Sequence, residues 1–143
     1  METTEKTLDL EVITPERLAY KDQVNFVVLP GQEGEAGILP GHAPYLTQLA
    51  VGELRIHKGS ETHFFAVSGG FAEVLAGRVK VFAETAEMEK EISVERARLA
   101  AERAKKEMVS ATTSKDIELA QAALRRALLR LRVSEGLSRR KNK

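Results

Sequence analysis

Arginines at helical spacing near the C-terminal end of the chain are the residues best suited to chemistry. Arg96 and Arg103 are seven residues apart, and Arg126 and Arg130 are four apart, so each pair lies on one face of a helix. Converging guanidinium groups bind phosphates or carboxylates through charge-assisted hydrogen bonds. The same spacing is also typical of a basic face in contact with water, and the spacing alone leaves both interpretations open.

Histidines and glycines are the next candidates. His57 and His63 fall on opposite sides of a predicted hairpin and could face each other across it. Two imidazoles without an acidic or sulfur ligand make a weak metal site, so we interpret them as exposed strand histidines and predict no metal site. Gly31, Gly34 and Gly37 are spaced loosely like a phosphate loop, but neither a Lys-Ser/Thr pair nor a helix start follows, which favours a turn.

Catalytic motifs are missing from the sequence. It contains no GxxxxGK[ST] phosphate loop, no GxSxG nucleophile elbow and no HExxH pair. Ser68-Gly69-Gly70 has no base partner in view and is better explained as a bend or bulge in a strand. The absence of cysteine excludes disulfides, zinc–cysteine sites and thiol nucleophiles. We therefore predict that the chain is not an enzyme and has no obligatory cofactor.

The charge is split along the chain. Residues 1–94 hold 8 Lys and Arg against 15 Asp and Glu, whereas residues 95–143 hold 14 against 6. Such halves usually meet different partners, and a basic segment suits nucleic acid, a nucleotide or an acidic protein surface. The aromatic side chains that stack on bases are missing from residues 95–143, so we predict no nucleic-acid partner.

Apolar runs are short throughout. None reaches the roughly 18 residues that a membrane span needs, and the polar, acidic start of the chain is unlike a signal peptide. We therefore expect a cytoplasmic chain whose link to a membrane comes only through a partner.

The N-terminal two thirds of the chain have the pattern of short β-strands. Leu8, Leu10 and Val12 alternate with acidic residues, which is the period-two pattern of a half-buried strand. Glycine-containing turns separate the apolar runs, which predicts an antiparallel sandwich or small barrel. The predicted strands cover residues 8–12, 17–20, 24–29, 38–39, 45–51, 53–57, 62–68, 71–75 and 78–82.

Helix-forming residues dominate beyond Glu84. A first helix is predicted over residues 94–109 with Ser93 as its N-cap, and a second begins with a capping box over residues 113–116. We expect Gly136 to end the second helix and residues 139–143 to form a frayed basic tail. Two apolar stripes, predicted to join the helices as an antiparallel hairpin, comprise Ala97, Ala100, Ala101, Ala104 and Met108, and Ile117, Ala120, Leu124, Leu128 and Leu131.

The predicted architecture is therefore α+β, in two modules. Residues 1–87 form an antiparallel β-sandwich, and residues 88–143 form an antiparallel two-helix hairpin with a basic tail. A two-helix hairpin buries little surface by itself and needs support from the β-module or from a partner, so it is a plausible moving part.

Two motifs resemble the epsilon subunit family of F-type ATP synthases. The first is the loop Glu33-Gly34-Glu35-Ala36-Gly37-Ile38-Leu39-Pro40-Gly41-His42-Ala43-Pro44-Tyr45-Leu46-Thr47, and the second is Ser68-Gly69-Gly70-Phe71-Ala72-Glu73-Val74. Ala83-Glu84-Thr85-Ala86 and Leu131-Arg132-Val133 are also similar to the family. The likeness extends from Leu8 to about Val133, and the modules come in the same order.

The resemblance implies a non-catalytic rotor subunit of the central stalk, on the cytoplasmic face of a bacterial membrane. It implies that the β-module binds the gamma shaft and the c-ring, with Glu35 and His42 as rotor-contacting residues. It also implies that the hairpin moves between a folded and an extended state, and that the extended hairpin inhibits ATP hydrolysis. Attraction of the basic hairpin to an acidic surface on the beta subunits of the alpha/beta hexamer gives the inhibition a physical basis.

Some bacterial members of the family bind ATP on the hairpin through an Ile/Leu-Asp-x-x-Arg-Ala motif and later arginines. Ile92, Arg96 and Ala97 match this motif here, but Ser93 replaces its Asp. Further candidates by position are Glu87, Arg103, Arg126 and Arg130. Loss of the carboxylate removes a charge-assisted hydrogen bond of about 1–3 kcal/mol, so weak or absent ATP binding is expected. An ATP sensor therefore stays open as the alternative to a purely mechanical rotor subunit.

Overall fold

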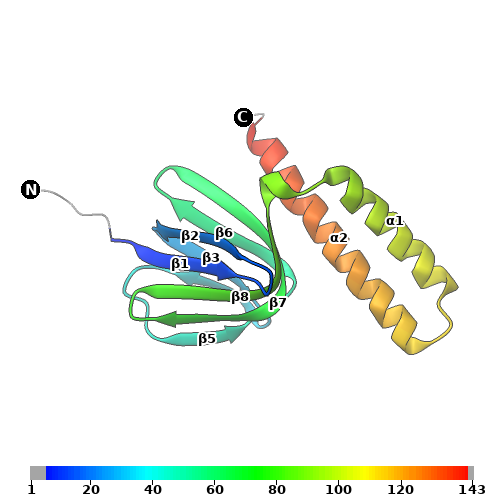
Figure 1. Ribbon diagram of the computed structural model, residues 1–143, viewed down its shortest axis with the longest axis horizontal. Coiled ribbons are helices and arrows are strands. Elements are labelled where there is room, and N and C mark those ends of the chain that lie inside the picture. Colours follow the sequence, from blue (N-terminus) through cyan, green and yellow to red (C-terminus); the bar gives the residue numbers. More distant parts are fainter. Residues whose placement is uncertain (1–5, 142–143) are drawn as a thin grey trace, which may run out of the picture. The chain divides into compact units, whose positions relative to one another are not determined.

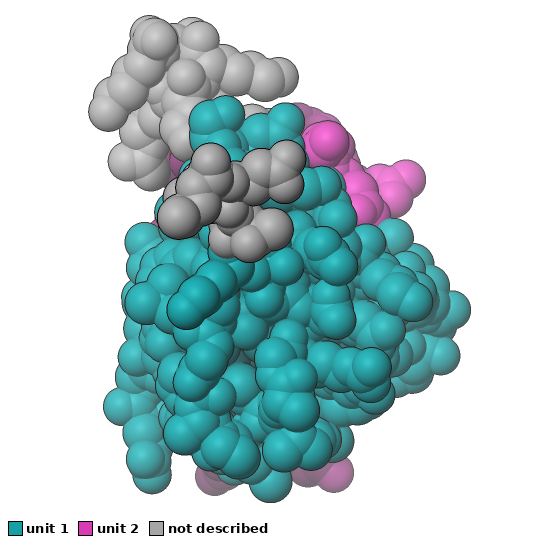
Figure 2. Space-filling model, turned by 90° about the vertical axis from the view of Figure 1, so that its left-hand side faces the viewer, with its two compact units in different colours: residues 1–88 teal, residues 89–143 magenta. Residues whose placement is uncertain are grey.

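The computed structural model of the chain describes residues 6–141. The chain divides into two compact units, residues 1–88 and residues 89–143 (Figure 2). The first contains the strands and the second contains the helices, so the predicted sandwich followed by two helices is confirmed.

The first unit contains eight strands among its described residues. They pair in the order β2-β1-β8-β7-β6-β3-β4, and β5 pairs with β7 (Figure 1). Their bounds are β1 (Leu8–Ile13), β2 (Leu18–Val24), β3 (Phe26–Gly31), β4 (Gly34–Ile38), β5 (Tyr45–Gln48), β6 (Gly52–Lys58), β7 (Glu61–Leu75) and β8 (Arg78–Met88). β1 and β8 run parallel, unlike the other pairs. No tight turn joins these two strands, so local chain reversal does not fix their direction.

The long strand β7 bends in the middle without breaking. Up to Val67 it pairs with β6, and from Phe71 onward it pairs with β5, while its register with β8 continues on both sides. Gly69 and Gly70 supply the bend with φ angles of 66° and 100°. A Cβ on Gly70 would lie 1.9 Å from the carbonyl oxygen of Phe82, so only glycine fits there. The predicted bend is thus confirmed.

Strand boundaries differ from the predictions in several places, including the end of β2, which runs to Val24 instead of Tyr20. β8 continues to Met88 instead of ending at Phe82, because its second half pairs with the part of β7 that precedes the bend. β4 begins at Gly34, inside the segment predicted to be a turn-rich loop, because it pairs with β3 across a tight turn. β5 ends at Gln48, and Leu49 makes only an isolated bridge with Gly31.

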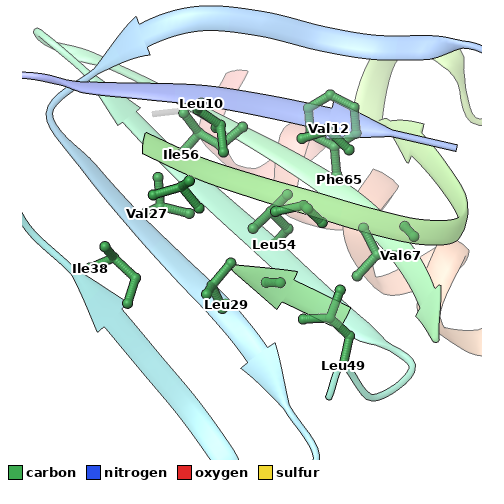
Figure 3. Close-up of a cluster of buried hydrophobic side chains, with 14 of the residues drawn as sticks. Leu10, Val12, Val27, Leu29, Ile38, Leu49, Leu54, Ile56, Phe65 and Val67 are labelled. Carbon is green, nitrogen blue, oxygen red and sulfur yellow. The ribbon is translucent and has the colours of Figure 1, made fainter. Parts of the chain in front are cut away.

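The core of the first unit is formed by the inward-facing side chains of the alternating strands. Leu10 and Val12 of β1 lie across from Leu54 and Ile56 of β6, and Phe65 of β7 packs among them (Figure 3). These five side chains are fully buried. Alternation places the intervening residues on the outer faces of the layers, where the candidate docking residues are found.

The second unit is an antiparallel helical hairpin. A 3-10 turn (Glu89–Glu91) precedes α1 (Val94–Ser110), and α2 (Ser114–Lys141) runs back alongside α1 (Figure 1). Ser93 and Thr113 cap the two helices as predicted. The expected end at Gly136 is wrong, since α2 continues through it to Lys141. One glycine costs a helix only about 1 kcal/mol, and the residues that follow are mostly good helix formers. The end of the predicted basic tail, residues 142–143, lies outside the described residues.

Alanines form the seam between the helices. Ala97, Ala101 and Ala104 of α1 are buried, as are Ala120 and Ala127 of α2. The stripe predicted on α2 is only partly correct, because side chains at two of its positions remain substantially exposed: Ile117 (37%) and Leu128 (47%). Each helix of the hairpin packs against only one other helix. The contact between them therefore buries a narrower strip of α2 than its whole apolar stripe.

Candidate functional site

Glu35 lies on β4, which pairs only with β3 among the described residues. Its Oε2 accepts a hydrogen bond from Nη2 of Arg55 at 2.8 Å. Arg55 lies on β6, so the ion pair reaches across β3. Both side chains are accessible to solvent, with exposed fractions of 67% for Glu35 and 40% for Arg55. The carboxylate is therefore accessible and is held at one of its two oxygens.

His42 lies in the turn between β4 and β5. Its backbone N–H donates to the carbonyl of Leu39 at 3.1 Å, and Nδ1 lies 2.7 Å from the carbonyl oxygen of Ala43. A carbonyl can only accept, so Nδ1 carries the proton and Nε2 is the acceptor of the neutral ring. The ring centroid lies 5.8 Å from that of Tyr45, the first residue of β5.

Exposed apolar side chains gather on β5, β7 and β8. Leu46, Phe71 and Leu75 are 69%, 47% and 51% exposed, and Phe71 stacks on Phe82 with ring centroids 5.0 Å apart. We call these four residues the outer apolar patch. A shallow groove of about 300 Å³ between β5 and β7 is lined by both Leu46 and Leu75. Clustered exposed apolar groups of this kind mark docking surfaces.

The four predicted arginines share one side of the hairpin. Arg96, Arg103 and Arg126 each directly precede a buried seam alanine, at positions 97, 104 and 127. A two-fold rotation relates two antiparallel helices that face each other across a seam. Residues that directly precede the seam residues on each helix therefore lie on the same side of the hairpin. Arg130 lies one turn after Arg126 on the same face. The first three are exposed and Arg130 is half-buried.

The start of α1 carries the match to the ATP motif. The hydroxyl of Ser93 accepts a hydrogen bond from the backbone N–H of Arg96 at 3.3 Å, so it acts as the helix cap. The N–H of Ile92 lies 3.4 Å from the carbonyl oxygen of Glu89, and Ala97 is part of the seam. Glu87, the remaining candidate, lies on β8 in the first unit.

The two strand histidines do not face each other. His57 pairs with Thr62 and His63 pairs with Ile56, which puts the imidazoles on opposite faces of the sheet. The His57 ring lies over Phe26, at a centroid distance of 5.3 Å, whereas Nε2 of His63 lies 3.3 Å from the carboxylate of Glu61. Within residues 6–141 no three metal-ligating side chains come together.

A separate ion pair joins β2 to the end of β6. Nζ of Lys58 donates to Oδ2 of Asp22. This hydrogen bond holds the pKa of the Asp22 carboxyl below its ordinary value and raises the pKa of Lys58. The pKa of the neighbouring Tyr20 is raised, chiefly by burial.

Sequence reasoning missed Arg55 and the outer apolar patch. The patch had a partial signal, because Phe71 and Leu75 alternate with the smaller apolar residues Ala72 and Val74, although Glu73 lies between them on the outer face of the strand. Arg55 had none, since its contact with Glu35 depends on the order of β6, β3 and β4 in space.

Comparison with known proteins identifies both units. Residues 7–89 match the beta-sandwich domain of the ATP synthase Delta/Epsilon chain, and residues 90–135 match its long alpha-helix domain. The ATP synthase epsilon chain of Nitratidesulfovibrio vulgaris (strain DP4) is 47% identical over 129 residues, which cover 90% of this chain and 96% of that protein. The epsilon chain of Desulforamulus reducens is 44% identical over 130 residues, covering 91% and 98%.

Solved structures agree. A chain in the Euglena gracilis mitochondrial ATP synthase, in a structure of OSCP, F1 and the c-ring, superposes with a TM-score of 0.75 at 25% identity, covering 87% of this chain and 79% of that one. A chain from the central stalk and c-ring of the Tetrahymena thermophila enzyme shares the fold, with a TM-score of 0.63 at 16% identity, covering 92% and 99%. No helix within residues 6–141 combines the length and apolarity needed to cross a membrane. The chain belongs to the ATP synthase delta/epsilon family, as a non-catalytic, epsilon-type member.

Proposed function

We propose that the chain is a rotor subunit of the central stalk, which couples ion flow to ATP synthesis and restrains ATP hydrolysis through its hairpin. The observation that carries the proposal is the pairing of a rigid β-unit, with an exposed docking surface, and a basic hairpin with a narrow alanine seam. The β-unit is suited to permanent attachment, and the hairpin is suited to changing its binding partner.

The outer apolar patch is the proposed contact with the gamma shaft. Leu46, Phe71 and Leu75 share one face of the paired strands β5 and β7, where they surround Glu73, and are too exposed to contribute to the core. The turn that carries His42 leads directly into β5 and its Tyr45, so the patch continues toward the predicted contact with the c-ring. Attachment to the cytoplasmic face of a bacterial membrane then comes through these partners.

The hairpin is the proposed brake. Residues 95–143 carry 14 basic against 6 acidic side chains, which favours an acidic surface on the beta subunits of the catalytic hexamer. The ATPase rate of the catalytic head with gamma, measured with the full chain and with residues 1–88, tests this. The full chain should slow hydrolysis, and residues 1–88 should bind without slowing it. If both proteins bind and neither slows hydrolysis, the hairpin is not an inhibitor. If neither protein binds, the proposed rotor function is wrong.

A second candidate function is ATP sensing by the hairpin. The common side shared by Arg96, Arg103, Arg126 and Arg130 favours it, and the use of the Ser93 hydroxyl as a helix cap weighs against it. We expect weak or absent binding. Calorimetric titration with ATP to millimolar concentration decides, with Ser93→Asp as the variant that supplies the missing carboxylate. Silence from both proteins would end the sensor hypothesis and leave the brake intact.

A further inference from the structure

Within residues 6–141 Glu35 forms its ion pair with Arg55, and the place of Arg55 in the sheet suggests a function. We propose that Arg55 positions the Glu35 carboxylate for docking, holding Oε2 and leaving Oε1 to a cationic or N–H donor on the rotor partner. The inference rests on the proposed function, since Glu35 is taken there as a rotor contact. It adds a residue that neither the family motif nor the sequence pattern indicated.

The sheet register explains how the two side chains meet. Arg55 of β6 pairs with Val28 of β3, and Val28 pairs in turn with Gly37 of β4. The three residues form one row across the outer face of the sheet. Gly37 has no side chain, and the Phe26 ring lies over it. Glu35 lies two residues earlier on the same face of β4, and its carboxylate reaches Arg55 across β3.

The backbone on both sides of the contact is constrained. A Cβ on Gly37 would lie 3.1 Å from two atoms of the Phe26 ring, and one on Gly31 would lie 2.7 Å from the carbonyl oxygen of Gly34. The β3–β4 hairpin is therefore closely packed, and β6 is fixed between β3 and β7. With both backbones held, the remaining freedom of Glu35 lies in its side chain, which the hydrogen bond from Arg55 restricts.

The ion pair has little value for the stability of the free chain. Exposed pairs of this kind contribute between almost nothing and about 1 kcal/mol, because water screens them and ordering two long side chains costs entropy. Docking changes this, since a partner that covers the pair removes the water and strengthens both hydrogen bonds to the carboxylate. The effect of Arg55 should therefore appear in binding and not in folding.

A double-mutant cycle on the full chain tests the proposal. Affinity for the isolated rotor, gamma with the c-ring, is measured for the natural chain, Arg55→Met, Glu35→Gln and the double variant. We expect Arg55→Met to weaken binding about 3- to 10-fold, with the melting temperature unchanged. In the Glu35→Gln background the same substitution should change little, because the group that it positions is gone.

Lys58→Met is the matched control. It removes one positive charge and one ion pair from the same strand, but its partner is Asp22. Its rotor affinity should equal that of the natural chain. Arg55→Met binding as tightly as the natural chain, or more tightly, would overturn the proposal, as would an equal loss in the presence and absence of Glu35. If the natural chain does not bind the rotor at all, the proposed function fails as well, so the two failures are distinguishable.

Discussion

The two units of the chain differ in the size of the side chains they bury. The sandwich encloses leucine, isoleucine, valine and phenylalanine between its layers, whereas alanines form the seam of the hairpin and Leu129 and Val133 are the larger apolar side chains buried among its described residues. Full burial of one large apolar side chain contributes about 1.5–3 kcal/mol, and an alanine contributes less in proportion to its smaller area. The sandwich can therefore serve as a fixed scaffold, while the two helices approach closely at a low gain per residue and can separate at a low cost.

Phe65→Ala should give the largest effect of the substitutions considered. Phe65 is fully buried in the sandwich core, so its truncation should cost about 3–5 kcal/mol of unfolding free energy in the first unit. Urea unfolding followed by amide NMR signals reads each unit separately. Phe71→Ala is the matched control, since the same truncation at a 47% exposed position should cost about 1 kcal/mol or less. Equal losses at the two positions would contradict the assigned core.

Ala104→Leu tests the narrow seam of the hairpin. Ala104 is 2% exposed, so a leucine would force the helices apart, at a cost of about 1–3 kcal/mol confined to the second unit. Lys105→Leu introduces the same side chain one position along, on the exposed face, and should be nearly neutral. Helical signals of the two variants in the same urea series provide the measurement. A neutral Ala104→Leu would mean that the seam is loose.

Ser93→Ala should have a smaller effect on the same unit. The hydroxyl of Ser93 accepts the hydrogen bond from Arg96 that caps α1, and loss of such a cap costs about 1 kcal/mol. Ser93→Asp should restore the cap, because aspartate is an equally good N-cap and its charge favours a helix N-terminus. Thermal unfolding followed by circular dichroism at 222 nm compares the melting temperatures of the natural chain and the two variants. If Ser93→Ala has the same melting temperature as the natural chain, α1 does not depend on this cap.

Local pattern predicted the order of the elements well, because alternation, glycine turns and helix caps act between near neighbours. Ser93, Thr113 and the bend at Gly69–Gly70 are all features of this kind. Local pattern did not predict the contacts between strands that are distant in the sequence. The parallel pairing of β1 with β8, the extension of β8 to Met88 and the Glu35–Arg55 ion pair each depend on which strands become neighbours in space. Helical spacing predicted that the candidate arginines share one side of the hairpin, but it does not identify a ligand for them.

The Asp22–Lys58 ion pair should give the smallest effect, and one that depends on pH. The pKa of Asp22 is lowered in the folded chain, so its contribution to stability is present above the ordinary value of 3.8 and is lost as pH falls through the folded pKa. The pKa of Lys58 is raised, so the same contribution is lost again only as pH rises beyond 10.5 through its folded pKa. Between these limits the stability difference between the natural chain and Asp22→Asn should be constant, and it should shrink toward zero in acid. Melting temperatures of the two proteins from pH 2 to pH 8 measure this difference. A difference that grows in acid would mean that Asp22 is stabilised in its protonated form, which the hydrogen bond from Lys58 opposes.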